Sequence, residues 1–216
     1  MYKPHKSESL ITHFHDKPWQ GNDPLLAIFL FVGLDANYDA NIDEALPETF
    51  DYLDDSVMWW QTNEERVHHP FLLPHYRGSG RRYHVKFAEI GFTPANAGLV
   101  SFVELLNIPT TGRSNLILAD LCTDYLSELN NKFDTGAARY IFVSRRVTEL
   151  MRQSKCFSRL LPNPLPMDGD LKVLRNENGQ IIYEMYHLSC YGWQLAILNR
   201  QIAQIREMLR NFIRGL

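Results

Sequence analysis

Hydrophobic residues gather along the chain in four short runs that are separated by longer mixed stretches. The first run, at 25–32, is eight unbroken apolar residues, which is too short to cross a membrane. The others lie at 98–106, 139–144 and 181–186. Apolar runs of this length are typical of strands buried on both faces of a parallel sheet. The pattern predicts an α/β fold of three layers, with helices flanking a four-stranded parallel sheet.

The stretches between and after these runs favour helices. Helices are expected at residues 82–90, 115–130, 145–161 and 194–213. The last of them places its apolar residues largely on one side, as a helix packed on a core does. Residues 1–24 are polar and rich in histidine, and we interpret them as an N-terminal arm. The remainder, 25–216, has the length of a single domain.

Composition limits the class of protein further. The chain is 45% hydrophobic and 22% charged, which is the profile of an ordinary soluble globular protein. Its net charge of −3 gives no global attraction to nucleic acid, so any such binding must use a local basic patch. Three cysteines without paired spacing argue against a disulfide framework or a zinc ribbon. We expect a cytoplasmic monomer that does not associate with membranes.

Two histidine pairs raise the question of a metal site. His13 and His15 form one pair, and His68 and His69 the other. Neither pair has helix-face spacing beside a carboxylate, which a metal-binding helix would need. The sequence therefore predicts no metal.

Three of the expected strands end close to a residue whose side chain could act in catalysis or ligand binding. Asp35 follows the first strand, Asn107 ends the second, and His187 follows the fourth. Parallel strands bring their carboxyl ends to one edge of a sheet, where ligands bind in open α/β folds. An acid, an amide and an imidazole are expected to converge there. Turn formation or helix capping would explain Asp35 and its neighbour Asn37 equally well.

A basic and aromatic segment at 75–87 is a candidate for nucleic-acid contact. Arg77, Arg81 and Arg82 lie there among tyrosines and histidines. Basic side chains would suit a phosphate backbone, and aromatic side chains would suit unstacked bases. An exposed loop before a helix is the alternative interpretation.

The loop at 108–114 is a second candidate for anion contact. Thr110, Thr111 and Ser114 offer hydroxyls, and Arg113 offers a positive charge. The expected helix that follows would add free backbone amides at its N-terminus. Simple capping accounts for the same residues.

Three motifs in order resemble those of the uracil-DNA glycosylase superfamily. The family motif Gly-Gln-Asp-Pro-Tyr-His corresponds to Gly-Leu-Asp-Ala-Asn-Tyr at 33–38. Its Leu-Leu-Asn strand end corresponds to 105–107, and its His-Pro-Ser-Pro-Leu motif to His-Leu-Ser-Cys-Tyr at 187–191. The resemblance covers the chain from about residue 25 onward. It implies the uracil-DNA glycosylase-like version of the four-stranded parallel fold.

The function implied by this resemblance is excision of uracil or a related damaged base from single- or double-stranded DNA. Such enzymes flip the base into a pocket and hydrolyse its N-glycosidic bond, with no cofactor. Asp35 would stabilise the sugar cation and orient a water, and His187 would donate a hydrogen bond to the departing base. Asn37 is an alternative to Asp35 for positioning the water. Asn107 would recognise the base through hydrogen bonds.

The resemblance implies further contacts around these residues. The substrate-binding set comprises Gly33, Tyr38, Asn107 and Ser144. DNA contacts would come from Ser189 and Tyr191. Leu188, Tyr191 or Trp193 could wedge into the gap that a flipped base leaves. The aromatic residue stacked on the base could be Phe50, Phe71 or Phe102.

Departures from the family motifs leave the excised base open. Ala36 and Asn37 replace a Pro-Tyr pair, and Leu188 and Cys190 replace two prolines. Two other functions are compatible with the sequence. One is a non-catalytic nucleic-acid or nucleotide-binding protein of the same fold. The other is an unrelated α/β hydrolase of small molecules, with Asp35 and His187 as its acid–base pair.

Overall fold

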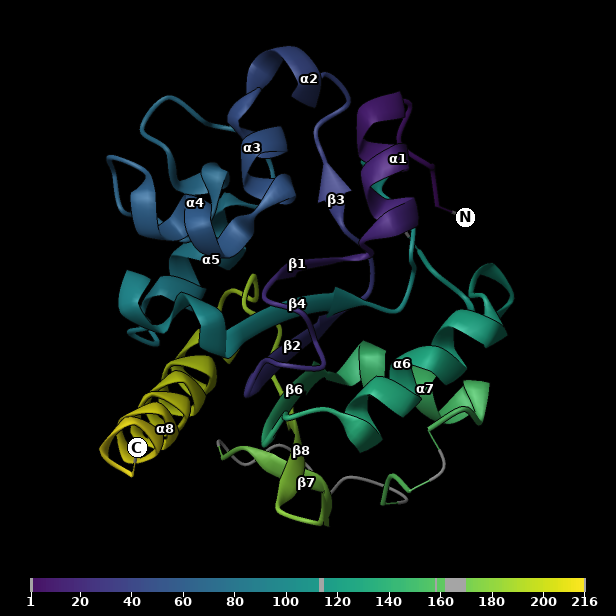
Figure 1. Cartoon of the computed structure of the whole chain (residues 1–216). Coiled ribbons are helices and arrows are strands. Elements are labelled where there is room, and N and C mark those ends of the chain that lie inside the picture. The colour runs from purple at the N-terminus through teal and green to yellow at the C-terminus, as the bar shows by residue number, and fades with distance from the viewer. Residues whose placement is uncertain (1, 113–114, 158, 162–169, 216) are drawn as a thin grey trace.

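The computed structural model describes residues 2–112, 115–157, 159–161 and 170–215 (Figure 1). Within these residues the main sheet has six strands in the order β1-β4-β2-β6-β8-β7. Their bounds are Trp19–Gly21 (β1), Phe29–Gly33 (β2), Val100–Glu104 (β4), Tyr140–Ser144 (β6), Lys172–Glu177 (β7) and Gln180–Met185 (β8). A separate pair, Asn37–Tyr38 (β3) and Thr110–Thr111 (β5), forms a short parallel ladder.

The four strands expected from the hydrophobic runs form the inner part of this sheet. β4, β2, β6 and β8 run parallel to one another, whereas the edge strands β1 and β7 run antiparallel to them. The sheet is therefore mixed, and the expectation of four parallel strands alone was incomplete. Both edge strands lack a long apolar run, because an edge strand is less enclosed than a central one.

The β7–β8 hairpin carries a local signal of its own. Its two-residue loop is Asn178-Gly179, and both residues have positive φ, 52° and 79°. Asn-Gly is the preferred pair for the tight turn of a hairpin. This turn explains why an edge strand as polar as β7 forms there.

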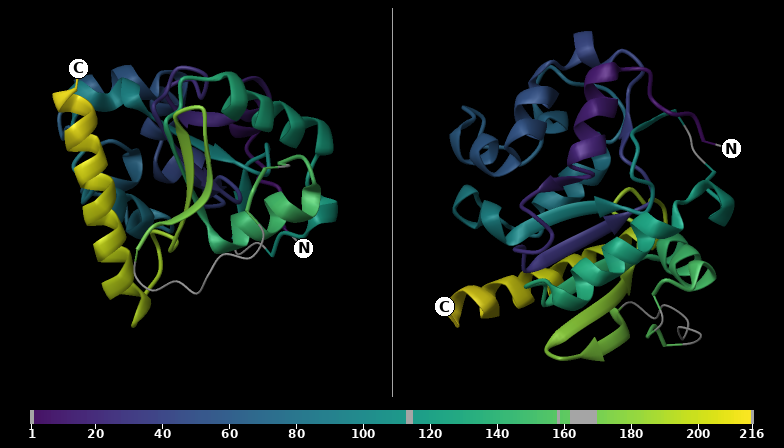
Figure 2. Two further views of the ribbon diagram at one scale, coloured as in Figure 1. Left: turned by 90° about the horizontal axis from the view of Figure 1, so that it is seen from below. Right: turned by 45° about the vertical axis from the view of Figure 1, so that its right-hand side comes forward.

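Helices cover both faces of the sheet. α6 (Thr123–Thr135) and α7 (Arg145–Ser154) pack on one face, and α5 (Arg81–Ala88) and α8 (Gln194–Arg214) on the other. Figure 2, left, shows α8 and the α6–α7 pair on opposite sides of the strands. The expected three layers are present. Two helices are shorter than expected: α6 begins at Thr123, and α7 stops before Lys155, which is left-handed (φ 60°).

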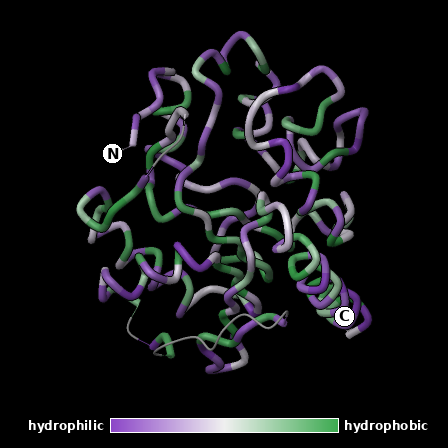
Figure 3. Tube along the Cα trace, turned by 180° about the vertical axis from the view of Figure 1, so that it is seen from behind, coloured by the Kyte–Doolittle hydropathy of each residue, from purple (hydrophilic) through white to green (hydrophobic). Residues whose placement is uncertain are grey.

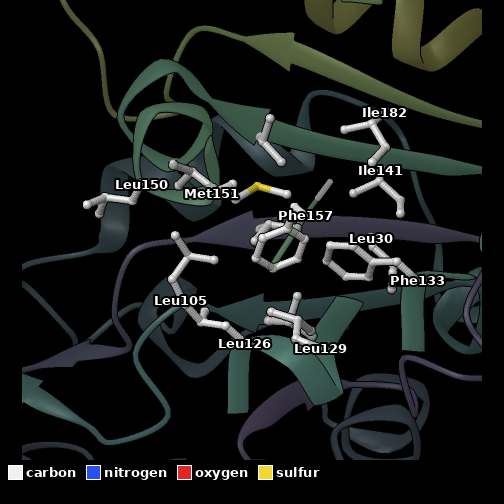
Figure 4. Close-up of a cluster of buried hydrophobic side chains, with 14 of the residues drawn as sticks. Leu30, Leu105, Leu126, Leu129, Phe133, Ile141, Leu150, Met151, Phe157 and Ile182 are labelled. Carbon is white, nitrogen blue, oxygen red and sulfur yellow. The ribbon is translucent and has the colours of Figure 1, made fainter. Parts of the chain in front are cut away.

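Alternation along the strands builds a core on each face. In β2, Leu30 belongs to the cluster under α6 and α7, while Phe29 and Phe31 belong to the cluster under α8. The first cluster is drawn in Figure 4, where side chains of the strands meet those of the two helices. Its labelled members include Leu30, Ile141, Ile182, Leu129, Phe133, Leu150 and Met151. The strands at the centre of the molecule are correspondingly hydrophobic (Figure 3).

Short helices gather at one end of the sheet, in the upper part of Figure 1. They are α1 (Glu8–Asp16), α2 (Ile42–Ala45), α3 (Glu48–Asp54) and α4 (Ser56–Thr62). Short 3-10 helices lie at Pro70–Leu72 (η1), Pro94–Leu99 (η2) and Leu118–Asp120 (η3). Among all the described residues, no helix combines the length and apolar content that crossing a lipid bilayer requires.

The segment at 1–24 was expected to be an arm, but its described part, residues 2–24, is built into the domain. The Ser7 side chain caps α1 by accepting a hydrogen bond from the Leu10 amide at 3.2 Å. Leu10 and Phe14 lie four residues apart, so they share one helix face and are buried against α2 and α3. β1 then pairs with β4. The segment contributes both core and sheet, which its polar composition concealed.

Candidate active site

A cavity of about 320 Å³ opens at the carboxyl ends of β2 and β4. Its walls come from residues 33–38 after β2, from Phe102 and Glu104 of β4, and from His187 and Ser189 after β8. This is the edge at which open α/β sheets bind ligands. Of the three residues predicted to converge here, Asp35 and His187 line the cavity, whereas Asn107 does not.

Asp35 and Asn37 are held by one threonine. The Thr110 hydroxyl donates a hydrogen bond to Asp35 Oδ2, and Thr110 Oγ1 accepts one from Asn37 Nδ2 at 3.0 Å. Asn37 Nδ2 also donates to the Gly112 carbonyl at 2.5 Å. Both amide hydrogens of Asn37 are thus engaged, so its side chain offers a ligand its carbonyl oxygen. The β3–β5 ladder, in which Asn37 pairs with Thr110, fixes this arrangement.

His187 is oriented by the backbone two residues later. Its Nδ1 accepts a hydrogen bond from the Ser189 amide at 3.2 Å, which leaves the proton of the neutral ring on Nε2. The Tyr83 ring packs against it with centroids 5.5 Å apart. Desolvation lowers the pKa of His187, and the Asp35 carboxylate acts in the opposite direction. A neutral His187 can therefore donate from Nε2 into the cavity.

Glu104 is a site residue that sequence reasoning missed. It ends β4 directly opposite Gly33 of β2. A Cβ at Gly33 would collide with the Glu104 carboxyl group, so that group can occupy its observed position only beside a glycine. Burial, and secondarily the Asp35 charge, raise the pKa of Glu104 well above its usual value. The available signal was a carboxylate inside an apolar strand, which is costly unless it has a function.

A layer of buried histidines forms another wall that the sequence did not predict. His69 and His84 line the cavity, with their rings stacked at 3.7 Å, and His69 Nε2 is 3.0 Å from Gln20 Oε1. His68 lies behind them, its Nε2 3.1 Å from His84 Nδ1. Burial lowers the pKa of His68 to about 3 and those of His69 and His84 well below the usual value. These rings are neutral at neutral pH.

In the described part of the chain, no group of three or more histidine, cysteine or carboxylate side chains is arranged to hold a metal ion. His13 and His15 lie on α1, whereas His68 and His69 directly precede η1.

Two expected substrate-binding residues do not line the cavity. β4 ends at Glu104, so Asn107 lies three residues beyond the strand, and Glu104 takes the position expected for it. Ser144 is the N-cap residue of α7, and its carbonyl accepts a hydrogen bond from the Thr148 hydroxyl at 3.1 Å. The Leu-Leu-Asn motif at 105–107 placed the end of the strand at Asn107, because apolar residues continue past the true end of β4 at Glu104.

Aromatic side chains complete the walls. Tyr38, Phe71 and Phe102 line the cavity, whereas Phe50 does not. Phe71 is stacked on Tyr76 with centroids 4.7 Å apart. Of the three candidates for stacking on a base, Phe71 and Phe102 are therefore in position to contact a ligand.

The three arginines expected to bind DNA from the segment at 75–87 have different surroundings. Arg81 donates hydrogen bonds to the carbonyls of Phe71 and Leu73 at 2.8 and 3.0 Å. These bonds hold the backbone of the cavity wall in place. Arg77 donates to the carbonyls of Tyr76 and Pro74. Arg82 is exposed, and its guanidinium lies 5.9 Å from the centre of the Tyr191 ring.

The loop after β8 exposes two large aromatic side chains. Tyr191 and Trp193 are 75% and 71% exposed, whereas Leu188 is buried at 2%. Leu188 cannot act as a wedge, because it belongs to the core under α8. Thr111 lies in β5, outside the cavity walls. Arg113, the remaining expected DNA contact, falls outside the described residues.

A scan against models of known protein families finds no match, and a search of curated protein sequences finds no similar sequence. The geometry of the cavity and the motif resemblance are therefore the observations that bear on function.

Proposed function

We propose that this protein is a DNA glycosylase that hydrolyses the N-glycosidic bond of uracil or a related damaged base. The observation that carries the proposal is the presence of Asp35, Asn37 and His187 around one cavity, with Asp35 oriented by Thr110. A base within a duplex is inaccessible, so the target would be flipped out of the stack into this cavity.

The dimensions of the cavity agree with a single base. Ligand pockets span about 300–1,000 Å³, and 320 Å³ is at the small end of that range. Among the described residues that line it, there is no lysine or arginine to hold a phosphate. This favours an uncharged base as the occupant over a phosphorylated small molecule. The sugar and phosphates of the substrate would remain at the mouth.

The proposed chemistry separates charge along one bond. The bond between C1′ of the sugar and the base nitrogen breaks, and the electron pair leaves with the base. The Asp35 carboxylate stabilises the positive charge that develops on the sugar. It then accepts a proton from a water whose oxygen forms the new bond to C1′. The Asn37 carbonyl oxygen is available to hold that water by accepting its second hydrogen.

His187 would act on the leaving group. Its neutral ring carries the proton on Nε2, because Nδ1 accepts from the Ser189 amide. The Nε2–H group can donate to an oxygen of the departing base, where negative charge accumulates. The base anion then takes its proton from solvent, so His187 need not change protonation state.

DNA would be held by the exposed loop beyond His187. Arg82 and Tyr191 lie side by side, and Trp193 is exposed two residues after Tyr191 in the chain. A cation beside exposed aromatic rings can contact both a phosphate and an unstacked base. Tyr191 or Trp193 could fill the gap that the flipped base leaves. This local surface would compensate for the net negative charge of the chain.

The test is incision of labelled oligonucleotides after alkali treatment, which cleaves DNA at abasic sites. Substrates would contain uracil, hypoxanthine or a mismatch, with Asp35→Ala beside the wild type. Asp124→Ala, at an exposed position on α6, is the matched control. We expect incision by the wild type and the control but not by Asp35→Ala. Binding of DNA without incision of any substrate would support the non-catalytic alternative instead.

A further inference from the structure

Glu104 presents an unused buried carboxyl group to the cavity. It ends β4 and lies against Gly33, which lacks a side chain that would push it away. Its Oε2 is buried and makes no hydrogen bond to any described residue. A buried polar atom without a partner is destabilising, so its retention points to a ligand that supplies the partner. The mechanism proposed above gives this group no role.

The groups around Glu104 offer no compensating positive charge. Those that face it come from four other elements: Asp35 after β2, Tyr38 of β3, Tyr83 of α5 and Tyr125 of α6. The three histidines of the cavity, His69, His84 and His187, all have lowered pKa values. Neither lysine nor arginine occurs among the described residues of the cavity wall. Glu104 therefore sits among neutral and negative groups, which favours its protonated form.

We propose, as a deepening of the glycosylase function above, that Glu104 reads the edge of the flipped base with one hydrogen-bond donor and one acceptor. A protonated carboxyl group has one O–H and one carbonyl oxygen. These match a base edge that presents a carbonyl beside an N–H, as uracil and hypoxanthine do. A carboxylate would present acceptors only and would face the carbonyl of such a base unfavourably. The substrate class is thus a base with this mixed edge.

The proposal predicts a specific pH dependence. Ionisation of Glu104 removes the donor, so kcat/KM of the wild type should fall as the pH rises through the raised pKa of Glu104. Glu104→Gln keeps one acceptor and supplies amide donors at every pH. We expect it to retain activity and to lose this alkaline decline. Glu104→Leu should lose about 10–100-fold in kcat/KM at all pH values, because the base edge is left unpaired.

The experiment measures kcat/KM on uracil-containing DNA for the three proteins over a pH series that begins near the ordinary glutamate pKa of about 4.3 and extends to about pH 8.5. Glu207→Gln, at an exposed position on α8, is the control and should follow the wild type. Affinity for free uracil, measured by calorimetry at the same pH values, requires no catalysis. It should weaken with rising pH in the wild type and stay constant in Glu104→Gln. Melting temperatures establish that each variant is folded.

Failure of the proposed role of Glu104 can be distinguished from failure of the glycosylase function. An active wild type whose alkaline decline persists unchanged in Glu104→Gln would overturn the role of Glu104 while the glycosylase function stands. A wild type that releases no base but binds free uracil with the expected pH dependence would contradict the glycosylase function and retain the role of Glu104 in base binding. Absence of both activity and uracil binding would overturn both.

Discussion

The Thr110 hydroxyl donates a hydrogen bond to the Asp35 carboxylate, although the two residues are 75 positions apart in the chain. The short β3–β5 ladder brings them together, because it pairs Asn37 with Thr110 immediately after the Asp35 loop. Thr110 is fully buried, so its hydroxyl has a fixed environment. The same oxygen accepts from Asn37, which links the two candidate water-binding side chains.

Replacing Thr110 by valine tests this link. Valine keeps the branched shape but removes the hydroxyl, so Asp35 and Asn37 lose their shared partner. A hydrogen bond to a charged group contributes about 1.5–3 kcal/mol, which corresponds to a fall of about 10–100-fold in kcat. KM should change little, because the contact orients a reacting group rather than the DNA. Thr111→Val is the control, and an equal loss in both variants would contradict the assignment.

Substitution of buried Leu188 should affect the stability of the fold, whereas substitution of exposed Trp193 should affect DNA binding. Leu188→Ala should lower the free energy of unfolding by about 2–5 kcal/mol, because the side chain is buried in the core. Trp193→Ala should leave stability nearly unchanged and weaken DNA binding by about 1–3 kcal/mol, the contribution of one stacked base. Urea unfolding and DNA titration measure the two quantities. Equal DNA affinity in wild type and in both Tyr191→Ala and Trp193→Ala would exclude this loop as the DNA contact.

Substitutions of the neighbouring Arg81 and Arg82 should affect different properties, stability in one case and DNA affinity in the other. Arg82→Gln removes an exposed charge, so DNA affinity should fall and the slope of log K against log salt should decrease by about 1. Arg81→Gln removes hydrogen bonds to two carbonyls of the cavity wall and should lower the melting temperature instead. Binding measured over a salt series resolves the difference. An unchanged salt slope in Arg82→Gln would show that this residue does not contact phosphate.

The buried neutral histidines should make the folded state less stable at acid pH. Burial lowers the pKa of His68 to about 3, whereas the unfolded chain has an ordinary histidine pKa near 6.5. The unfolded state therefore binds more protons between these pH values, and stability falls as the pH drops below about 6.5. Each such histidine adds up to about 1.4 kcal/mol per pH unit to this loss.

Urea unfolding at several pH values measures this loss. His68→Gln should show a shallower decline in stability between about pH 6.5 and pH 4 than the wild type. His15→Gln is the control, since the His15 side chain is 86% exposed. Parallel declines in the wild type and His68→Gln would contradict the assignment of a neutral buried His68.

The sequence predicted the inner strands and the residues that directly follow them more successfully than the rest of the site. Asp35 and His187 come directly after buried strands, so the hydrophobic pattern alone brings them to one edge. Glu104 was missed because it lies inside an apolar run, and Asn107 was favoured because it follows that run. Local pattern does not reveal where a strand ends when apolar residues continue into the next loop.

Other parts of the site depend on contacts between distant segments. Thr110 reaches Asp35 through a two-residue ladder, which is too short to leave a periodic signal. His69 caps η1 and His84 lies on α5, and only packing between these elements stacks their rings. α1 looked like an arm because its buried face consists of two residues among many polar ones.

The most direct test of the glycosylase function is detection of the free base. Uracil-containing DNA would be incubated with excess protein, and released uracil and abasic sites would be quantified together, by mass spectrometry and by aldehyde labelling. We predict equal amounts of both products from the wild type and a loss of about 100-fold or more in the rate with Asp35→Asn. Strand cleavage without free uracil, or release that is unaffected by Asp35→Asn, would contradict the account.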